Sequence, residues 1–531
     1  MGLRLTKLNY LELPGLDISV DFSRATEKGS QQPILDVATQ DRLLDEMVTL
    51  EAGGVANASE SRQVGHYWLR DPDLAPEPEI RDAIANQQKR IFDFVVGLLG
   101  RFQRVIHLGI GGSALGPQLL VDCFEAESIK LTLNPVESRS WSRQIDFIDN
   151  ADVHTLEACV SGAGITQPRL ADTLIVVASK SGGTLEVMAA LAGVEQKARE
   201  VGDNHLPDHA VALTGPGSSL DQRADEEGWL ARFAIPEWVG GRTSIFGAPG
   251  LLTLGLLDGH ARLALDGETR ATGFLEGGRR MDALTRSRDH DTNPALRLAL
   301  CWHAAFQAGV RTLVFLPYCD RLGRLGSYLQ QLIMESLGKD GHGFNVLGHK
   351  GTTDQHALIQ HLCEGPNDSL ITFIEVLEQE DPIRPLGGSY DVEVEDGVHL
   401  SDIMSAFLAG TRAALSDAGR PCVTLTLRRL DEASLGALIA LIERAVGFYA
   451  SLVGINAYDQ PGVEAGKRSA ARFLKLQREL LAALTQTPNL SREALVSRLG
   501  ASLPDVRHVL NHLVANGRVV ASDEGYSPAG S

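Results

Sequence analysis

The feature that most constrains the fold is a unit that occurs twice: a short apolar run, a loop rich in glycine or serine, and a helical segment. The first unit begins with Arg104–Leu108 and continues through the loop Gly109–Gly116. The second begins with Thr173–Ala178 and continues through Ser179–Thr184. A strand, a polar turn and a helix in repeated order are typical of a parallel sheet with helices on both faces.

The same pattern continues along most of the chain, which with 531 residues is long enough for two large domains. Further strands are predicted over 210–214, 311–316, 370–377 and 421–427, and a long helix over 322–338. We therefore predict an α/β fold with two doubly wound parallel-sheet domains. The predicted segments are a helical and loop region (1–90), the first sheet domain (91–270), the second (271–450), a loop and helix (451–484) and a small C-terminal module (485–531).

Charge and cysteine usage exclude several functional classes. The net charge of −19 disfavours general binding to nucleic acid or to an anionic membrane. No apolar stretch is long enough to span a bilayer, and the start of the chain shows no secretory signal. The six cysteines are scattered without a CxxC pair, which predicts neither a disulfide framework nor a structural zinc. We expect a cytoplasmic protein.

The two loops are candidate phosphate cradles. Backbone amides at a helix start, with the hydroxyls of Ser113, Ser179, Ser181 and Thr184, would surround a phosphate, and Lys180 would lie near by. Each loop alone is equally compatible with a tight turn or an ordinary helix cap. The first loop matches neither the P-loop nor the dinucleotide-binding spacing. Two such loops in one α/β half favour the phosphate interpretation.

Four other segments carry charged side chains that a structural role alone does not require. They contain Arg242 after a glycine pair, Glu335 in an otherwise apolar or amide helix, His356 after Gly351-Thr-Thr-Asp, and Lys467 at the end of a loop. A single glutamate on a helix is usually solvated, and a single histidine is usually structural. Their interest therefore lies in their combination.

Together these segments resemble the glucose-6-phosphate isomerase family. The matching stretches, in the order of the family, are GIGGSALGP, SKSGGT, GGRTS, QQLIMESLGK, GTTDQHALIQ and DQPGVEAGK. They extend from about residue 105 to 470. The resemblance implies two sugar-isomerase (SIS) domains and the reversible aldose–ketose isomerisation of glucose 6-phosphate and fructose 6-phosphate through a cis-enediol. It implies no metal and no nucleotide cofactor.

The resemblance also implies a role for each residue of the motifs. Glu335 would move the proton between C2 and C1, Arg242 would stabilise the enediolate, and His356 and Lys467 would assist ring opening. In the family the histidine comes from the neighbouring subunit, which implies a homodimer. The implied ligands of the sugar phosphate are Gly112, Ser113, Ser179, Lys180, Ser181, Thr184, Gln331 and Gln460.

Some positions depart from the pattern of the family. The second loop has Gly183 where a hydroxyl residue is usual, Leu337 replaces asparagine, and Thr353-Asp354 replaces Asn-Gly. Residues 125–143 resemble an insertion. None of these changes removes an implied catalytic residue, so they bear on substrate affinity more than on the type of reaction.

The C-terminal module has a different pattern, with helices predicted over 468–484, 491–499 and 503–516 and a hairpin around Asp523-Glu524. Three helices and a hairpin describe a winged-helix module. Residues 485–531 contain four arginines and four acidic residues, and such a neutral module favours a contact with protein over binding to DNA.

Two other functions remain open on the sequence: an isomerase that also accepts mannose 6-phosphate, and a transcription regulator that senses a sugar phosphate. A sensor would need the phosphate loops but not Glu335, Arg242, His356 and Lys467 together. The sequence therefore favours the enzyme.

Overall fold

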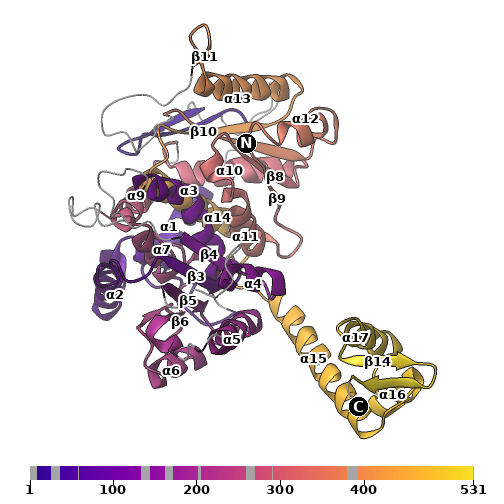
Figure 1. Ribbon diagram of the computed structural model, residues 1–531. Helices are drawn as coiled ribbons and strands as arrows, with labels where there is room; N and C mark the ends of the chain where they lie inside the picture. Colours follow the sequence, from indigo (N-terminus) through magenta and orange to yellow (C-terminus); the bar gives the residue numbers. More distant parts are fainter. Residues whose placement is uncertain are drawn as a thin grey trace. The chain divides into compact units, whose positions relative to one another are not determined.

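The computed structural model describes residues 9–25, 36–57, 59–132, 144–161, 172–200, 202, 205–258, 269–289, 291–378 and 393–529, without the side chains of 125–132, 161 and 463–465. The chain forms two compact units, Met1–Tyr458 and Asp459–Ser531 (Figure 1). The predicted α/β class with parallel sheets is confirmed. The five-segment division of the sequence stays a prediction.

The first sheet has five parallel strands in the order β4–β3–β5–β6–β7. Its strands are β3 (Arg104–Gly109), β4 (Gln144–Ile148), β5 (Thr173–Ser179), β6 (Ala210–Thr214) and β7 (Ala231–Ala234). All seven residues of β5 are buried. A continuous apolar run of this kind is what a central parallel strand requires, because helices cover both of its faces.

The second sheet has six strands in the order β1–β2–β13–β10–β8–β9. Its parallel part consists of β8 (Thr312–Pro317), β9 (Asn345–Gly348), β10 (Ser369–Val376) and β13 (Cys422–Leu427). Two antiparallel strands extend it at one edge, β1 (Tyr10–Leu13) and β2 (Ile18–Arg24).

The prediction of only helix and loop over residues 1–90 was wrong, because β1 and β2 lie in this region. In β2 the side chains of Ile18, Val20 and Phe22 are buried and alternate with less buried residues. That alternation is the signature of a strand with one face on the core. The short length of the run concealed it, and its partner β13 is about 400 residues away in the sequence.

Helices cover the sheets and fill the space between them. They are α1 (Val37–Glu51), α2 (Pro78–Gly97), α3 (Leu115–Thr132), α4 (Val153–Ser161), α5 (Leu185–Glu200), α6 (Ser219–Glu226), α7 (Ala248–Leu257), α9 (Arg270–Thr285), α10 (Pro294–Gln307), α11 (Leu325–Leu337), α12 (Gln355–Glu364), α13 (Leu400–Asp417) and α14 (Glu432–Val453). A small hairpin, β11 (Glu393–Glu395) and β12 (Val398–His399), precedes α13. The predicted insertion at 125–143 overlaps the end of α3, and its residues 133–143 lie outside the described part.

Helix α14 is the central core helix of the first unit, and Figure 1 shows α7, α9, α11 and α14 between the two sheets. The expectation that no apolar stretch is long enough to span a bilayer does not hold, because within the described residues α14 alone has the length and apolar composition of a membrane span. However, 83% of its most apolar window is buried inside the protein. Its apolar character is therefore explained by its packing in the core.

The second unit consists of α15 (Val463–Gln486), α16 (Arg492–Leu499), α17 (Leu503–Ala515) and the antiparallel hairpin of β14 (Val519–Ser522) and β15 (Gly525–Pro528). Its own core contains Leu480, Leu484, Leu495 and Leu510. The hydroxyl of Ser491 accepts a hydrogen bond from the Ala494 amide at 3.1 Å, so this residue caps α16 as predicted. Lys467 lies in the second turn of α15 rather than at its start.

Candidate active site

The carboxyl edge of the first sheet brings the two glycine- and serine-rich loops together. Strands β3 and β5 are direct neighbours, and Gly109 at the end of β3 pairs with Ala178 near the end of β5. The loops that follow these strands therefore leave the sheet side by side. This edge is where open α/β sheets bind their ligands.

The Gly109–Gly116 loop packs directly on the loop that carries Arg242. A Cβ atom on Gly112 would lie 2.1 Å from the carbonyl oxygen of Gly241 and 2.7 Å from the amide nitrogen of Arg242. The hydroxyl of Ser244 donates a hydrogen bond to the Gly112 carbonyl at 3.3 Å. Because the Arg242 loop occupies the space of a side chain, position 112 requires glycine. Ser113 follows in the same 3₁₀ turn, Gly111–Ser113.

Glu335 and Arg242 form an ion pair at the base of this loop. Nη1 of Arg242 lies 3.2 Å from Oε1 of Glu335, and the two side chains are 6% and 18% exposed. Glu335 lies on α11, which follows β8 of the second sheet, and Arg242 lies in the 3₁₀ turn Gly241–Thr243, which follows β7 of the first sheet. A carboxylate and a guanidinium are thus held together, largely shielded from water.

Gln331 lies one turn before Glu335 on α11 and faces the glycine loop. A Cβ on Gly111 would be 3.1 Å from its Nε2 atom. The Oε1 atom of Gln331 is buried and has no hydrogen-bond partner among the described residues. A buried acceptor without a partner is costly, so a donor such as a sugar hydroxyl would satisfy it.

The hydroxyl groups of the second loop form a cluster. Oγ of Ser179 and Oγ1 of Thr184 are 2.9 Å apart, and Oγ of Ser181 lies 3.4 Å from Oγ1 of Thr184. The amide of Gly183 faces Ser181 Oγ at 3.4 Å, and the amide of Thr184 faces Ser179 Oγ at the same distance. The loop thus gathers three hydroxyls and two amides, which are the donors that a phosphate group requires.

Lys180 points away from this hydroxyl cluster. Its ammonium group donates to the carbonyl of Glu237 at 2.9 Å and to the carbonyl of Val239 at 2.6 Å. Burial lowers the pKa of Lys180 to about 8, and the charge of Arg62 contributes to the shift. The prediction that Lys180 lies near the hydroxyls holds for its backbone, but its charged group is engaged elsewhere.

A short segment, residues 456–458, is fixed by cations at three successive carbonyls. The carbonyl of Asn456 accepts from Lys339, and that of Ala457 accepts from Nη2 of Arg242 at 2.5 Å. The carbonyl of Tyr458 accepts from Nη2 of Arg62 at 3.0 Å. The segment is the last part of the first unit and ends two residues before Gln460.

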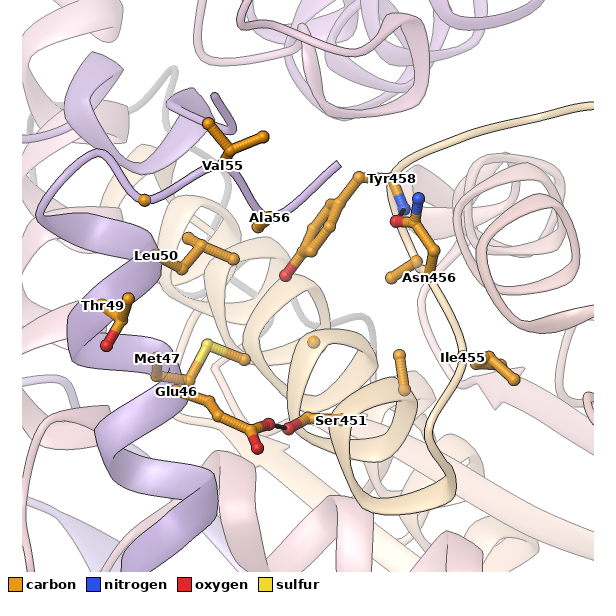
Figure 2. A pocket seen from close by; sticks show the side chains of 14 residues that line it. Glu46, Met47, Thr49, Leu50, Val55, Ala56, Ser451, Ile455, Asn456 and Tyr458 are labelled. Carbon is orange, nitrogen blue, oxygen red and sulfur yellow. Dashed lines mark hydrogen bonds between the residues drawn. The ribbon is translucent and has the colours of Figure 1, made fainter. Parts of the chain in front are cut away.

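The 456–458 segment also forms one wall of a cavity of about 320 Å³ beside α1 and the end of α14. Figure 2 shows the ring of Tyr458 pointing into this cavity together with Leu50, and the hydrogen bond between Ser451 and Glu46 at its border. The lining is mostly apolar. The segment therefore turns its carbonyls to the cations and the Tyr458 ring to an apolar space.

The remaining predicted residues are His356, Gln460 and Lys467. His356 is exposed in the first turn of α12, and no described contact joins it to Glu335 or Arg242. Gln460 and Lys467 belong to the second unit. Within the described residues, no group of three or more His, Cys, Asp or Glu side chains is arranged to hold a metal ion.

Sequence reasoning missed Arg62 and assigned no role to Lys339. Arg62 lies in a loop outside every quoted motif, so no local signal marked it. Lys339 ends the stretch QQLIMESLGK, four residues after Glu335, and its place in that stretch was a usable signal. Both side chains donate to backbone carbonyls. Because every residue has a carbonyl, the residue types at these contacts give no signal in the sequence.

The stability of the glycine loop is expected to depend on pH through His107, which is 2% exposed on β3 and whose Nε2 lies 2.8 Å from the Ser113 carbonyl. Burial lowers the pKa of His107 to about 4. Between pH 6.5 and 4 the imidazole of His107 is protonated in the unfolded chain and remains neutral in the folded chain. The free energy of unfolding should therefore fall by up to about 3 kcal/mol. Thermal unfolding of His107→Gln should depend less on pH between 7 and 4.5 than that of the wild type; equal dependence would contradict this role.

Comparison with known proteins shows which family the chain matches. The profile of the phosphoglucose isomerase family matches residues 21–418 and 413–484. The chain is 45% identical over 494 residues to a glucose-6-phosphate isomerase of Synechococcus elongatus, with 89% of this chain and 87% of that protein covered. It is 44% identical over 524 residues to one of Citrifermentans bemidjiense, with 94% and 92% covered.

Among solved structures, a glucose-6-phosphate isomerase of Chlamydia trachomatis superposes with a TM-score of 0.74 at 23% identity, covering 96% of this chain and 93% of that one. This likeness shows the shared fold. The family match over most of the chain and the 44–45% identity to curated relatives show the family as well as the fold. The chain belongs to the phosphoglucose isomerase family.

Proposed function

We propose that this protein catalyses the reversible isomerisation of D-glucose 6-phosphate and D-fructose 6-phosphate. The observation that carries the proposal is the pairing of Glu335 with Arg242 at 3.2 Å, beside two loops of amides and hydroxyls. Relatives at 44–45% identity named glucose-6-phosphate isomerase support it.

The proposed reaction moves one carbon-bound proton within the open-chain sugar. The carboxylate of Glu335 takes the proton from C2 of the aldose, and the C1 carbonyl becomes an enediolate oxygen. Arg242 stabilises that developing negative charge. Glu335 then returns the proton to C1, and a proton passes between the two oxygens, so that the carbonyl ends at C2. Ring opening before this step is assigned to His356 and Lys467.

The binding roles follow from the two loops. The hydroxyls of Ser179, Ser181 and Thr184 hold the phosphate, with the loop Gly112-Ser113 on the neighbouring strand. Gln331 meets a sugar hydroxyl through its buried acceptor, and Gln460 provides a further contact. Neutral donors suit a phosphate that must bind and leave repeatedly in a protein with a net charge of −19.

We also propose that the protein works as a homodimer in which His356 completes the site of the neighbouring subunit. The exposure of His356 at the start of α12 is compatible with this role. A dimer that mixes Glu335→Gln and His356→Ala subunits should then regain activity, because one of its two sites carries neither change. If His356 acted within its own subunit, each site would carry one change and activity would stay low. Steady-state assays of refolded mixtures, against each variant alone, decide between these outcomes.

The second unit is assigned as a winged-helix-like module on the basis of its three helices and hairpin. The relative from Citrifermentans bemidjiense aligns with 94% of the chain, which leaves too few residues unmatched to omit all of 485–531. The module therefore has at least a partial counterpart in a family member. Because its residues 485–531 contain four arginines and four acidic residues, the module is proposed to contact protein rather than DNA. The protein is expected in the cytoplasm.

The test is the conversion of fructose 6-phosphate to glucose 6-phosphate by the purified protein, with and without a chelator and with mannose 6-phosphate tested alongside. Conversion between fructose and glucose phosphates alone supports the proposal. Conversion of mannose 6-phosphate as well would extend the substrate range. Tight binding of sugar phosphates without turnover would overturn the proposal and favour a regulatory sensor.

A further inference from the structure

The segment Glu237–Val239 leads directly to the glycine pair Gly240-Gly241 and to Arg242. A glycine pair restricts the backbone little, so the position of Arg242 depends on what holds the chain before it. Each carbonyl of this segment accepts a described hydrogen bond. That of Trp238 accepts from the Gly65 amide at 3.0 Å, and the other two accept from cationic side chains.

Lys180 holds the carbonyls at both ends of the segment, 2.9 Å from Glu237 O and 2.6 Å from Val239 O. It does so from inside the Ser179–Thr184 loop, and its own carbonyl accepts a hydrogen bond from the Gly215 amide at 2.9 Å. The backbone of Lys180 is therefore fixed to the sheet edge. Its side chain joins the hydroxyl loop to the segment that precedes Arg242.

Arg62 provides the second connection. Its Nη1 donates to the carbonyl of Glu237 at 2.9 Å, and its Nη2 donates to the carbonyl of Tyr458 at 3.0 Å. Arg242 itself donates to the adjacent carbonyl, that of Ala457. The planar guanidinium of Arg62 thus fixes the distance between the Glu237–Val239 segment, which precedes Arg242, and the 456–458 segment, to which Arg242 donates.

The two cations are placed together in spite of their repulsion. Both donate to the carbonyl of Glu237, and the charge of Arg62 is one cause of the lowered pKa of Lys180. Glu60 pairs with Arg62, and the carboxylates of Glu60 and Glu237 act on Lys180 only at longer range. Such an arrangement is costly for a merely structural contact, since a neutral donor would satisfy the same carbonyls.

We propose that Lys180 and Arg62 are positioning residues that clamp the Glu237–Val239 segment and thereby hold Arg242 against Glu335. The inference rests on the proposed isomerase function and assigns Lys180 a role other than phosphate binding. Catalytic groups must be held to within a fraction of an ångström, and a displacement of about 1 Å costs on the order of 10²-fold in rate.

The experiment compares the Lys180→Met and Arg62→Met enzymes with the wild type in the conversion of fructose 6-phosphate. Both variants are expected to lose about 10- to 100-fold in kcat, with KM changed by less than about threefold. Thr184→Val, which removes a hydroxyl from the loop, is expected to show the opposite pattern, a raised KM with little change in kcat. Lys89→Met is the matched control, because Lys89 is an exposed lysine on α2 whose ion pair, among the residues that the structure describes, is with Asp93.

Two further measurements separate positioning from folding and from phosphate binding. Lys180→Arg and Arg62→Lys keep donors at the carbonyls and should recover part of kcat. The double variant Lys180→Met/Arg62→Met should lose less than the product of the two single losses, because both residues hold one segment. Inhibition by inorganic phosphate should be nearly unchanged in Lys180→Met.

A raised KM and weaker phosphate inhibition in Lys180→Met, with kcat unchanged, would show that Lys180 is a phosphate ligand and overturn the proposal. Unchanged kcat in both variants would also overturn it. If the wild type bound phosphate without converting sugar, the proposed function itself would fail. The phosphate affinity of Lys180→Met would then still report whether its ammonium meets the ligand.

Discussion

Replacing Glu335 with glutamine is expected to lower kcat by about 10²- to 10⁴-fold, the range that a general base contributes. Glutamine has nearly the same size and can still meet Arg242 through its amide oxygen. It cannot, however, accept the proton from C2. Since the change acts on the chemical step, KM for fructose 6-phosphate should change little. Steady-state assays in both directions measure the two constants.

A second measurement makes this prediction more specific. If Glu335 carries the proton, the wild type should exchange hydrogen at C1 and C2 with heavy water during turnover, and Glu335→Gln should lose exchange and isomerisation together. Glu276→Gln is a suitable control, because Glu276 also pairs with arginines, Arg279 and Arg280, but on the exposed face of α9. A Glu335→Gln enzyme with more than about a tenth of the wild-type kcat would contradict the assignment of the base.

The sequence predicted the parts of this site that depend on local pattern. A strand followed by glycines and a helix is recognisable within about twenty residues, so both loops and their strands were placed correctly. Because the carboxyl ends of parallel strands share one edge, these two loops lie side by side in the structure. The pairing of Glu335 with Arg242 follows only from the fold, since α11 and the 3₁₀ turn Gly241–Thr243 belong to different parts of the chain.

The missed features depend on long-range contacts. Strand β2 pairs with β13 from the other end of the first unit, and the length of the intervening chain hides that partner. The contact of Arg62 with Glu237 and Tyr458 is made to carbonyls, which every residue possesses. Lys180 shows the same limitation, because its motif predicted the loop but not the direction of the side chain.

The glycine at position 183 illustrates a departure that the structure accommodates. The usual hydroxyl is absent there, yet the hydroxyl of Thr184 still lies within hydrogen-bond distance of the hydroxyls of Ser179 and Ser181. The amide of Gly183 faces the same cluster. The loop therefore keeps a set of donors for phosphate, and the loss of one hydroxyl is expected to affect affinity rather than the reaction.

Asp282→Asn is expected to destabilise the first unit by about 3–5 kcal/mol. Asp282 is fully buried on α9 and accepts hydrogen bonds from Arg70 at 2.7 and 3.0 Å and from Arg444 at 2.8 Å. Burial alone would raise its pKa, but the charges of Arg444 and Arg70 outweigh burial and hold the pKa at about 2. Removing this charge leaves two buried guanidinium groups short of a counter-ion.

Glu443 provides the matched comparison, because it is buried in the same cluster and pairs with Arg70. Burial raises its pKa to about 7, and its Oε1 atom has no hydrogen-bond partner within the described residues. At neutral pH this carboxyl is therefore about half protonated. Glu443→Gln should destabilise the protein much less than Asp282→Asn, although both change one buried acid to its amide.

The two acids also predict opposite dependences on pH. Between pH 4.5 and 7 the folded chain keeps the proton of Glu443 that the unfolded chain releases, so its contribution to stability is present at low pH and is lost as the pH rises through 7. For Asp282 the contribution is present above about pH 4 and is lost as the pH falls toward 2.

Urea unfolding of the wild type and both variants at pH 5 and 8 measures the effect of Glu443. Relative to the wild type, Glu443→Gln should be destabilised more at pH 5, where the contribution of Glu443 is present, than at pH 8, where it has been lost. Asp282→Asn should be the more destabilised variant at both pH values. Equal losses in the two variants at both pH values would show that Arg70 and Arg444 do not depend on Asp282 for their charge compensation.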